Sequence, residues 1–494
     1  MDNDPGSVKA SDINDLHSAL AFLAQIPGQL VSTQVEVDPY LELAGVYRLV
    51  GAGTPVAPPT KIGPAMVFEK VKGYDMPVVA GILACRKRTA LLVGSTPERL
   101  MFDLIAGLER PVPPVTVESS SAPCQEVVIR PPFDINKVIP PVVSTKLDAG
   151  PFFNLGLLRA RDPETGASDV TIHRLCVIGP DRLTVSITPG RHIGMFWSKA
   201  EAMGRPLPVS VSIGVDPAIY LATSFEPPTT PVGFDELTIA GGLRGRPVEL
   251  ADCVTQPVQA VARAEIVLEG EFRPGDRADE DVLTGLGWAM PEFPGYLGKA
   301  QKDLAVLHVT AVTHRVRPIL QILVGPGEEH VTLSGLPTEA SIYRLVEDSM
   351  PGFLKNVYVP PAGGGKYLAI LQVRKRSIYD EGRQRQAALT AFAAFYELKH
   401  VILVDEDVDL YDPNDVMWAM TTRYQGDLDT VFIPEVKCHN LDPSATPEYN
   451  SRLPVPGVGC KTIFDCTVPF ALKERFLRSP FIDVDLQKFL PPES

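Results

Sequence analysis

Cysteine is scarce in this chain, and its spacing shows no metal-binding or disulfide pattern. Seven cysteines are spread over 494 residues, and no two of them form a C-x-x-C pair. An odd and scattered set argues against a disulfide framework and against a structural zinc site. We therefore expect free thiols in a reducing compartment, the cytoplasm.

Long apolar runs are also absent. The longest, such as residues 77–84, fall well short of the roughly 20 residues that a membrane-spanning helix needs. The opening segment MDNDPGSVKASD is acidic and lacks the apolar core of a secretory signal. These two absences predict a cytoplasmic protein that has no membrane partner.

Positive charge is in deficit. The chain has 46 Lys and Arg against 60 Asp and Glu, which gives a net charge of −14. This balance argues against a nucleic-acid-binding protein, which would present a basic face. It does not exclude an anionic substrate, because a site can be locally basic on an acidic protein. Hydrophobic residues make up 45% of the chain, enough to bury large cores.

The chain divides into three regions, in keeping with a domain size of about 150 residues. Residues 1–125 alternate helical and strand-like segments and end in a Pro- and Ser-rich stretch. Residues 126–325 carry short β-branched runs between Gly and Pro, typical of a mostly antiparallel sheet or barrel. Residues 326–494 alternate again, which favours a parallel or mixed α/β sheet.

Hydrophobic periodicity predicts the individual elements. We expect helices at 12–27, 96–108, 198–202, 335–350, 384–397 and 412–422, with the helix at 335–350 entered through Pro337 and Thr338. We expect strands at 65–69, 78–83, 170–178, 183–187, 209–213, 264–268, 304–312, 367–374 and 400–404. The acids at 405–409 lack the Gly and the final Glu of a calcium-binding loop, so we place them at a strand end.

Polar residues gather in the segment DVTIHRLCVIGPDRLTVSITPGRHIGMF, residues 169–196. In a regular strand Asp169, Thr171 and His173 share one face, and Arg174 lies on the other. A strand hairpin would bring residues 190–192, Gly-Arg-His, back beside this strand. The residues alone leave two interpretations open, a weak anion site or polar strand faces in solvent.

Two further segments have the composition of a site. Hydroxyls and carbonyls at 222–225, followed by Glu236, suit a hard cation or a plain surface loop. Glu292 lies between two prolines and among aromatics, where a raised pKa would make it a general acid. A surface carboxylate is the alternative there. Lys366 follows three glycines but does not complete a phosphate-binding P-loop, and no G-x-G-x-x-G fingerprint follows a strand.

Longer segments narrow these alternatives. They include SSAPCQE, DAGPFFNLGL, DVTIHRLCVIG, GRHI, DPAIYLATSFEPPTTP, AMPEFPGYLG, VGPGEEHVTLSGLPTEASI, AGGGKYLAILQV, DEGRQRQAAL and KTIFDCTVP. Together, from about residue 38 to 483, they resemble the UbiD family of prenylated-flavin-dependent decarboxylases, in its hydroxyarylic-acid branch. The resemblance implies an α/β fold with a central split-barrel flavin-binding domain. An N-terminal α/β segment and a C-terminal α/β oligomerisation domain would flank it.

The resemblance also implies two bound cations. Asp169, His192 and Glu236 match the ligands of a divalent metal, usually Mn²⁺, that bridges the phosphate of prenylated FMN. Oxygen and imidazole ligands suit such an ion. A potassium ion would lie nearby, contacted by Glu236 and by residues of the 222–225 segment, namely Ala222, Thr223, Ser224 and Phe225.

For catalysis, the resemblance assigns Arg174 to the cofactor and the substrate carboxylate, and Glu292 to protonation of the product carbon. His330 would contact a ring hydroxyl of the substrate. Further cofactor contacts would come from Thr171, Arg191 and Lys366, beside the metal and potassium ligands Asp169, His192, Ser224, Phe225 and Glu236. One departure stands out, because Gly287 occupies the place of a second family glutamate. The usual Glu–Arg–Glu network is therefore expected to be incomplete.

The implied activity is reversible, non-oxidative decarboxylation of an aromatic hydroxy acid, 3,4-dihydroxybenzoate to catechol. Pyrrole-, furan- or indole-carboxylates are alternative substrates, and a flavin-binding protein without decarboxylase activity is an alternative class. The implied partners are a flavin prenyltransferase that supplies the cofactor and further copies of the chain, as a dimer or a hexamer.

Overall fold

A closed barrel occupies the centre of the molecule. The computed structural model describes residues 8–53, 58–188 and 190–489. Six strands form the barrel in the order β12-β9-β6-β7-β8-β15, and β12 pairs with β15 to close it. Their bounds are β6 Phe152–Arg161, β7 Ser168–Val177, β8 Arg182–Val185, β9 Leu207–Ile213, β12 Ile266–Ala278 and β15 Leu304–His314. All these pairs are antiparallel, as the sequence predicts for the middle region.

Short helices and strands surround the barrel, and several of them contain or adjoin residues predicted to bind the cofactor or metal. The helices are α5 Ile135–Val138, α6 His192–Ala202, α7 Pro217–Ala222 and α8 Leu237–Arg244. The strands are β4 Val115–Thr116, β5 Val127–Ile129, β10 Glu249–Asp252, β11 Gln259–Val261, and the hairpin β13 Trp288–Pro291 with β14 Leu297–Lys299. The helix expected at 198–202 begins earlier, at His192, so the 190–192 segment opens a helix instead of continuing a strand hairpin.

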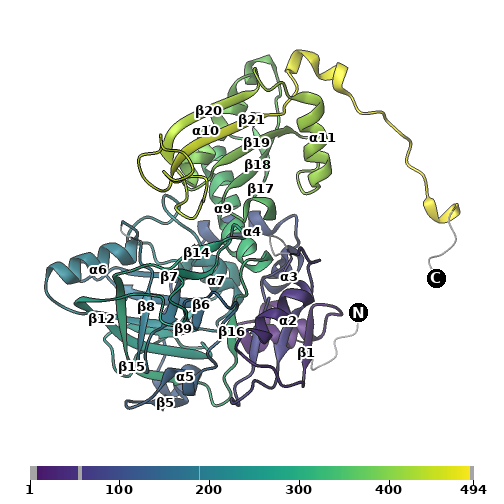
Figure 1. Cartoon of the computed structure of the whole chain (residues 1–494). Coiled ribbons are helices and arrows are strands. Elements are labelled where there is room, and N and C mark those ends of the chain that lie inside the picture. The colour runs from purple at the N-terminus through teal and green to yellow at the C-terminus, as the bar shows by residue number, and fades with distance from the viewer. Residues whose placement is uncertain (1–7, 54–57, 189, 490–494) are drawn as a thin grey trace.

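The N-terminal part packs beside the barrel (Figure 1). Its sheet has the order β1-β2-β3-β16, with β1 Leu30–Thr33, β2 Ala65–Phe68, β3 Val78–Ala80 and β16 Leu320–Ile322. Its helices are α1 Leu16–Ala24, α2 Glu42–Gly51, α3 Arg86–Leu92 and α4 Leu100–Glu109. Helix α1 starts later than predicted because Asp15 is its N-cap and accepts from the Ser18 amide at 2.8 Å. Strand β16 comes from far along the chain and completes this sheet.

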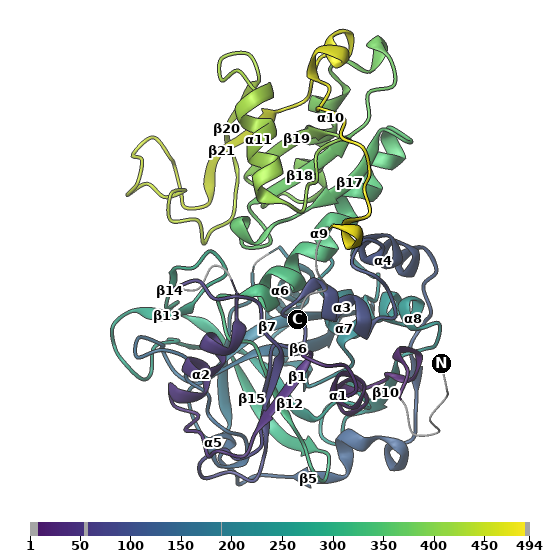
Figure 2. The same cartoon turned by 90° about the vertical axis from the view of Figure 1, so that its right-hand side faces the viewer.

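A long helix connects the barrel to the C-terminal part (Figure 2). Helix α9 spans Glu328–Ser349, so the prediction that it is entered through Pro337 and Thr338 is wrong. Pro337 lies inside the helix, where it removes one backbone donor. Leu336 and Ala340 on either side of it are buried, and this packing outweighs the local preference of proline for a helix start. His330 is therefore helical and lies in the first turns of α9.

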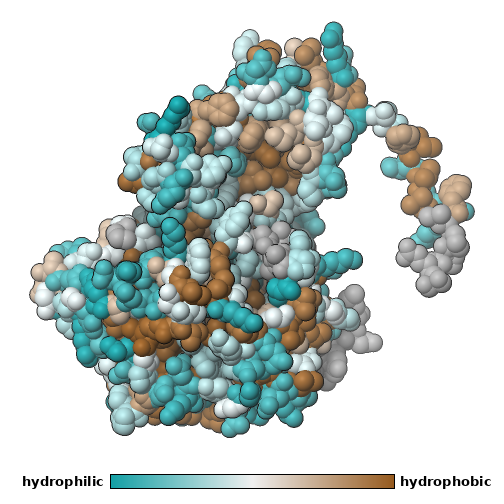
Figure 3. All heavy atoms as spheres, in the orientation of Figure 1, coloured by the Kyte–Doolittle hydropathy of each residue, from teal (hydrophilic) through white to brown (hydrophobic). Residues whose placement is uncertain are grey.

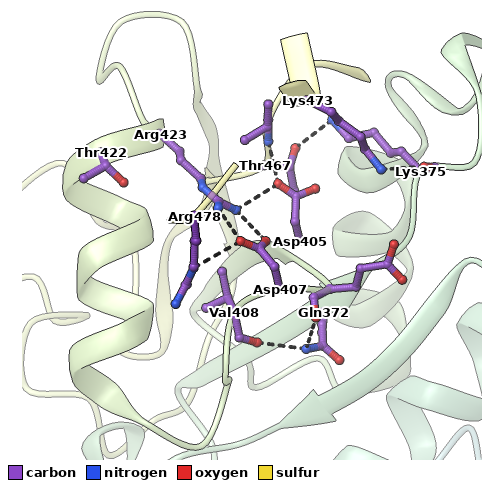
Figure 4. A network of polar contacts seen from close by, with 12 residues as sticks. Gln372, Lys375, Asp405, Asp407, Val408, Thr422, Arg423, Thr467, Lys473 and Arg478 are labelled. Carbon is purple, nitrogen blue, oxygen red and sulfur yellow. Dashed lines mark hydrogen bonds and ion pairs between the residues drawn. The ribbon is translucent and has the colours of Figure 1, made fainter. Parts of the chain in front are cut away.

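The C-terminal part is a mixed α/β sheet of order β17-β18-β19-β21-β20, as predicted. Its strands are β17 Leu354–Tyr358, β18 Leu368–Val373, β19 His400–Asp405, β20 Thr430–Lys437 and β21 Val458–Asp465, with helices α10 Arg383–Ala394 and α11 Pro413–Arg423. The acids after β19 bind cationic side chains (Figure 4). Arg423 contacts Asp405 at 3.2 Å and Asp407 at 2.6 Å, and Arg478 contacts Asp407 at 3.2 Å. This network holds the base of the C-terminal tail against α11.

None of the helices in the described ranges is both long and apolar enough to cross a membrane.

Candidate active site

Two acids and a histidine from three separate elements meet beside the barrel. Asp169 lies on β7, His192 is the first residue of α6, and Glu236 is the N-cap of α8. All three are buried, and one potential ligand atom of each lies within 4.8 Å of the others. His192 Nδ1 is 2.7 Å from Asp169 Oδ1. The structure thus brings together the three residues that the sequence predicts as metal ligands.

The electrostatics of this group fit a divalent cation. Burial, and then the charge of Asp169, raise the pKa of Glu236 well above its usual range. Within the described part of the chain, Glu236 Oε2 is buried and has no hydrogen-bond partner. A bound cation would satisfy that oxygen and relieve the repulsion between the two carboxylates. Carboxylate oxygens with one imidazole are a ligand set that suits Mn²⁺.

The residues predicted to bind potassium lie at the C-terminal end of α7 and directly after it. Ala222 ends this helix, and Ala222, Thr223 and Phe225 are buried. The Thr223 hydroxyl donates to the Ile219 carbonyl and the Ser224 hydroxyl to the Tyr220 carbonyl, each at 2.9 Å. Both hydroxyl oxygens therefore keep lone pairs for another contact. Potassium binding here stays a prediction.

Arg174 on β7 lies between two glutamates. Its guanidinium donates a short hydrogen bond to Glu292 and a second one, of 3.1 Å, to Glu280. The expectation of an incomplete Glu–Arg–Glu network is therefore wrong, because Glu280, just after β12, supplies the carboxylate that Gly287 lacks. Gly287 has a φ of 76°, a backbone conformation that favours glycine. Glu280 was not predicted from the sequence. This residue lies in the charged run Arg-Ala-Asp-Glu-Asp, which has the composition of a solvent-exposed segment.

Glu292 has the environment of a carboxyl held ready to carry a proton. It follows β13, and the residue is only 7% exposed. Burial raises its pKa, while the charge of Arg174 opposes that rise. A Cβ added at Gly298 would lie 2.7 Å from Glu292 Cγ, so the facing strand β14 must have glycine there. The backbone thus closes tightly over this carboxyl, as the proline-flanked loop predicts.

Aromatic and imidazole rings stand next to Glu292. The ring of Phe293 contacts His330 at 5.5 Å, Tyr367 at 5.0 Å and His439 at 4.7 Å between centroids. Burial lowers the pKa of His330 to about 3, so this imidazole is neutral and acts as an acceptor or donor, not as a cation. Tyr367 and His439 were not predicted, because neither belongs to a pattern that the sequence alone displays.

Arg191 and Lys366 meet at one acidic cluster. Arg191 contacts Glu226 at 2.7 Å and Glu397 at 3.0 Å. Lys366 contacts the same two acids, at 3.9 and 3.3 Å. Thr171 lies on β7, two residues from Asp169. The cofactor contacts assigned to these three side chains stay predictions, and Glu226 and Glu397 are additions that the sequence did not indicate.

Comparison with known proteins agrees with this fold. Models of 3-octaprenyl-4-hydroxybenzoate carboxy-lyase, UbiD, match the N-terminal domain at residues 23–108, the Rift-related domain at 115–328 and the C-terminal domain at 331–466. The chain belongs to the UbiD family, which makes it a carboxy-lyase of the UbiD type. The resemblance and the fold class inferred from the sequence are confirmed.

Individual relatives cover nearly the whole chain. A gallate decarboxylase of Lactiplantibacillus plantarum is 46% identical over 483 residues, which are 96% of this chain and 99% of the relative. The apo structure of the Klebsiella pneumoniae 3,4-dihydroxybenzoic acid decarboxylase AroY is 55% identical, with a TM-score of 0.92 and coverage of 97% and 99%. An evolved dimeric form of the UbiD-class enzyme HmfF from Pelotomaculum thermopropionicum, in complex with prFMN, is 34% identical, with a TM-score of 0.82 and coverage of 97% and 99%.

Proposed function

We propose that this chain decarboxylates an aromatic hydroxy acid, 3,4-dihydroxybenzoate to catechol, reversibly and without net oxidation. The observation that carries the proposal is the pairing of buried Glu292 with the partly buried Arg174, with Glu280 on the second side of the guanidinium. A cation to hold a carboxylate and a buried acid to return a proton are the two groups this reaction needs. The 3,4-dihydroxybenzoic acid and gallate decarboxylases support the choice of substrate.

The cofactor we propose is prenylated FMN, which a UbiD-class relative binds. When bound, it supplies an electrophile that accepts electrons from the aromatic ring while CO₂ leaves. Asp169, His192 and Glu236 would hold a divalent cation, Mn²⁺, whose charge would offset that of the cofactor phosphate. The 222–225 segment and Glu236 would hold potassium, and Thr171, Arg191 and Lys366 would contact the cofactor.

The protein's own part in the reaction is to orient the acid and move one proton. The planar guanidinium of Arg174 orients the substrate carboxylate. After the C–C bond to the carboxylate breaks and CO₂ departs, protonated Glu292 delivers its proton to the same ring carbon and becomes a carboxylate. Solvent then restores that proton. Neutral His330 accepts a hydrogen bond from a ring hydroxyl, which makes the ring more electron-rich.

The experiment is a panel of aromatic acids assayed for CO₂ release, with protein made with and without a flavin prenyltransferase. Mass spectrometry of the same samples reports the cofactor. We expect release of CO₂ from 3,4-dihydroxybenzoate only after co-expression, together with the mass of prenylated FMN. If CO₂ is released only from pyrrole-, furan- or indole-carboxylates, one of these acids is the substrate in place of 3,4-dihydroxybenzoate. Bound cofactor without any CO₂ release would indicate a flavin-binding protein that is not a decarboxylase.

We further propose that the chain works as a cytoplasmic homo-oligomer, a dimer or a hexamer, built through its C-terminal domain. All seven cysteines are free thiols, which suits a reducing compartment. Every residue from 477 to 489 is exposed, and this arm runs clear of the body (Figures 1 and 3). Large apolar side chains lie on it, namely Leu477, Phe481, Ile482, Val484, Leu486 and Phe489. Such an arm suits burial against a second copy.

A further inference from the structure

Glu397 lies in the short loop between α10 and β19, where the C-terminal part faces the barrel. Its side chain is buried, yet it meets three basic groups. Oε1 accepts from Arg191 Nη2 at 3.0 Å. Oε2 lies 3.3 Å from both Lys366 Nζ and His439 Nε2. Burial alone would raise its pKa, but the charges of Lys366 and Arg191 outweigh burial and hold it below the usual range.

The backbone around Glu397 is held in place by a buried lysine. Lys461 on β21 is buried, and its ammonium donates to the carbonyls of Tyr396 and Leu398, the two residues that flank Glu397. The same ammonium lies 5.1 Å from the centroid of the Phe392 ring. Burying a lysine is costly unless its donors are satisfied. The arrangement therefore stabilises one loop conformation, the one that points Glu397 at the site.

Glu397 also fixes the orientation of His439. The Leu441 amide donates to His439 Nδ1 at 3.0 Å, so Nδ1 carries no proton in the neutral ring. The proton lies on Nε2, which faces Glu397 Oε2. Held at both nitrogens, the imidazole packs edge-on against Phe293, the residue next to Glu292. Lys366 lies over that same ring, 5.6 Å from its centroid.

The contacts of Glu397 cross from one part of the protein to the other. Lys366, His439 and Glu397 itself come from the C-terminal part, while Arg191 caps α6 on the barrel. Tyr396, beside Glu397, accepts a further bond from Arg191 at 3.2 Å. Glu226 pairs with Arg191 as well and lies with it on the barrel side, and it reaches across to Lys366 only at 3.9 Å, against 3.3 Å for Glu397. One carboxylate therefore both orders the wall of the site and ties the two parts together.

We propose that Glu397 is a positioning residue that holds Lys366 and His439 against the Glu292 loop and, through Arg191, closes the C-terminal part onto the barrel. The kinetic side of this inference rests on the proposed decarboxylase function. The closure does not, because it concerns contacts of the chain itself. No reacting atom needs to touch Glu397 for either effect.

Glu397→Gln is the test, with Glu226→Gln as the matched control. Glu397 accepts through two carboxylate oxygens, whereas a glutamine has one acceptor oxygen. The glutamine NH₂ group would face the N–H donors of the neighbouring side chains and could not accept from them. At least one side of the cluster must then open. Glu226→Gln removes the same charge beside Arg191 but no contact to His439. Hydrogen exchange by mass spectrometry on the full chain reports the backbone amides of both regions.

For Glu397→Gln we expect exchange to quicken about tenfold or more in peptides covering 191–198 and 437–442, which include the Leu441 amide. For Glu226→Gln we expect the change only in the first peptide. Unchanged exchange at 437–442 in Glu397→Gln, or an equal change in both variants, would overturn the inference. If Glu397→Gln does not fold, Arg191→Met breaks the same contact from the barrel side. This variant should speed exchange in 191–198 and leave 437–442 protected. Faster exchange in both peptides, or in neither, would count against the inference.

Kinetics of the loaded enzyme separate positioning from general stability. We expect Glu397→Gln to raise KM about tenfold and to lower kcat less, when assayed well below the melting temperature of the variant. Suppose the parent protein releases CO₂, and KM, kcat and exchange at 437–442 in Glu397→Gln all equal those of the parent. The positioning role of Glu397 is then wrong, and the proposed function stands. If no acid yields CO₂ but Glu397→Gln still exposes 437–442, the proposed function fails and the closing role stands.

Discussion

Glu280 accepts a hydrogen bond of 3.1 Å from Arg174 on the side of the guanidinium that Glu292 leaves free. Two carboxylates therefore share one cation. The charge of Glu280 adds to burial in raising the pKa of Glu292, while Arg174 lowers it. The three residues form one electrostatic unit even though position 287 is a glycine.

Replacing Glu280 should shift the pH dependence of the enzyme. Glu292 must be protonated to act as an acid, so kcat/KM of the parent protein falls as pH rises through its raised pKa. Glu280→Gln removes a negative charge, lowers that pKa, and moves the falling limb to lower pH. The measurement is kcat/KM for 3,4-dihydroxybenzoate against pH.

Gly287→Ala is the matched control for this shift. A Cβ there meets no atom within 4 Å, so only the positive φ of 76° opposes it. We expect about 1–2 kcal/mol of destabilisation from that conformation and an unmoved pH limb. A limb that stays in place in Glu280→Gln would show that Glu280 does not act on Glu292.

Glu292→Gln should abolish turnover while the cofactor stays bound. The amide keeps the size of the side chain but has no acidic proton to donate to the ring carbon. Loss of a positioned acid typically costs about 10²–10⁴-fold in rate. CO₂ release measures the activity, and the flavin absorbance of the purified protein measures retention. Full activity with bound cofactor would remove Glu292 from the proton-transfer step.

Glu236→Gln should abolish stabilisation by Mn²⁺. The parent protein buries two carboxylates that repel each other, so a divalent cation should raise its melting temperature. At a concentration of 100 times Kd the gain in free energy of unfolding is about 2.7 kcal/mol. Glutamine removes a charged ligand atom and the repulsion together, so the variant should gain little from the metal. Thermal unfolding with and without Mn²⁺, with metal analysis of the protein, measures this.

The neighbouring acid gives the control for that experiment. Asp235 directly precedes the N-cap residue Glu236, accepts from the Leu237 amide at 3.0 Å and pairs with Arg159 at 2.8 Å. Asp235→Asn should lower stability yet keep the increment due to Mn²⁺. An equal Mn²⁺ increment in Glu236→Gln and the parent protein would exclude Glu236 as a ligand.

Local patterns predicted most elements, and the failures have a physical reason. The strands at 65–69 and 400–404 were found because each is a short apolar run, rich in β-branched residues at 400–404, of a length typical of a strand. The start of α9 was missed because tertiary packing of Leu336 overrides the proline beside it. Propensity describes a segment by itself, and here the decisive free energy comes from what the segment packs against.

The site divides in the same way. Asp169, His192, Glu236 and Glu292 lie in segments whose resemblance to a family marks them. Glu280 and Glu397 lie in no such pattern, because an ion pair between distant residues leaves no periodic signal in the chain. Arg174 lies on β7 and Glu280 lies just after β12. The two side chains become neighbours only when the strands assemble into the closed barrel. A single sequence shows the charges of both but not their pairing.

Removing the C-terminal arm should reduce the size of the assembly. Phe481 is 92% exposed and Ile482 85%, and they belong to a run of six large exposed apolar side chains on the arm, a pattern that marks interaction surfaces. Truncation after Phe476, or the pair Phe481→Asp and Ile482→Asp, should give a smaller mass by light scattering than the full chain. Val455→Asp, at another exposed apolar side chain, should leave the mass unchanged. If the truncated and full chains have the same subunit number, the arm plays no part in assembly.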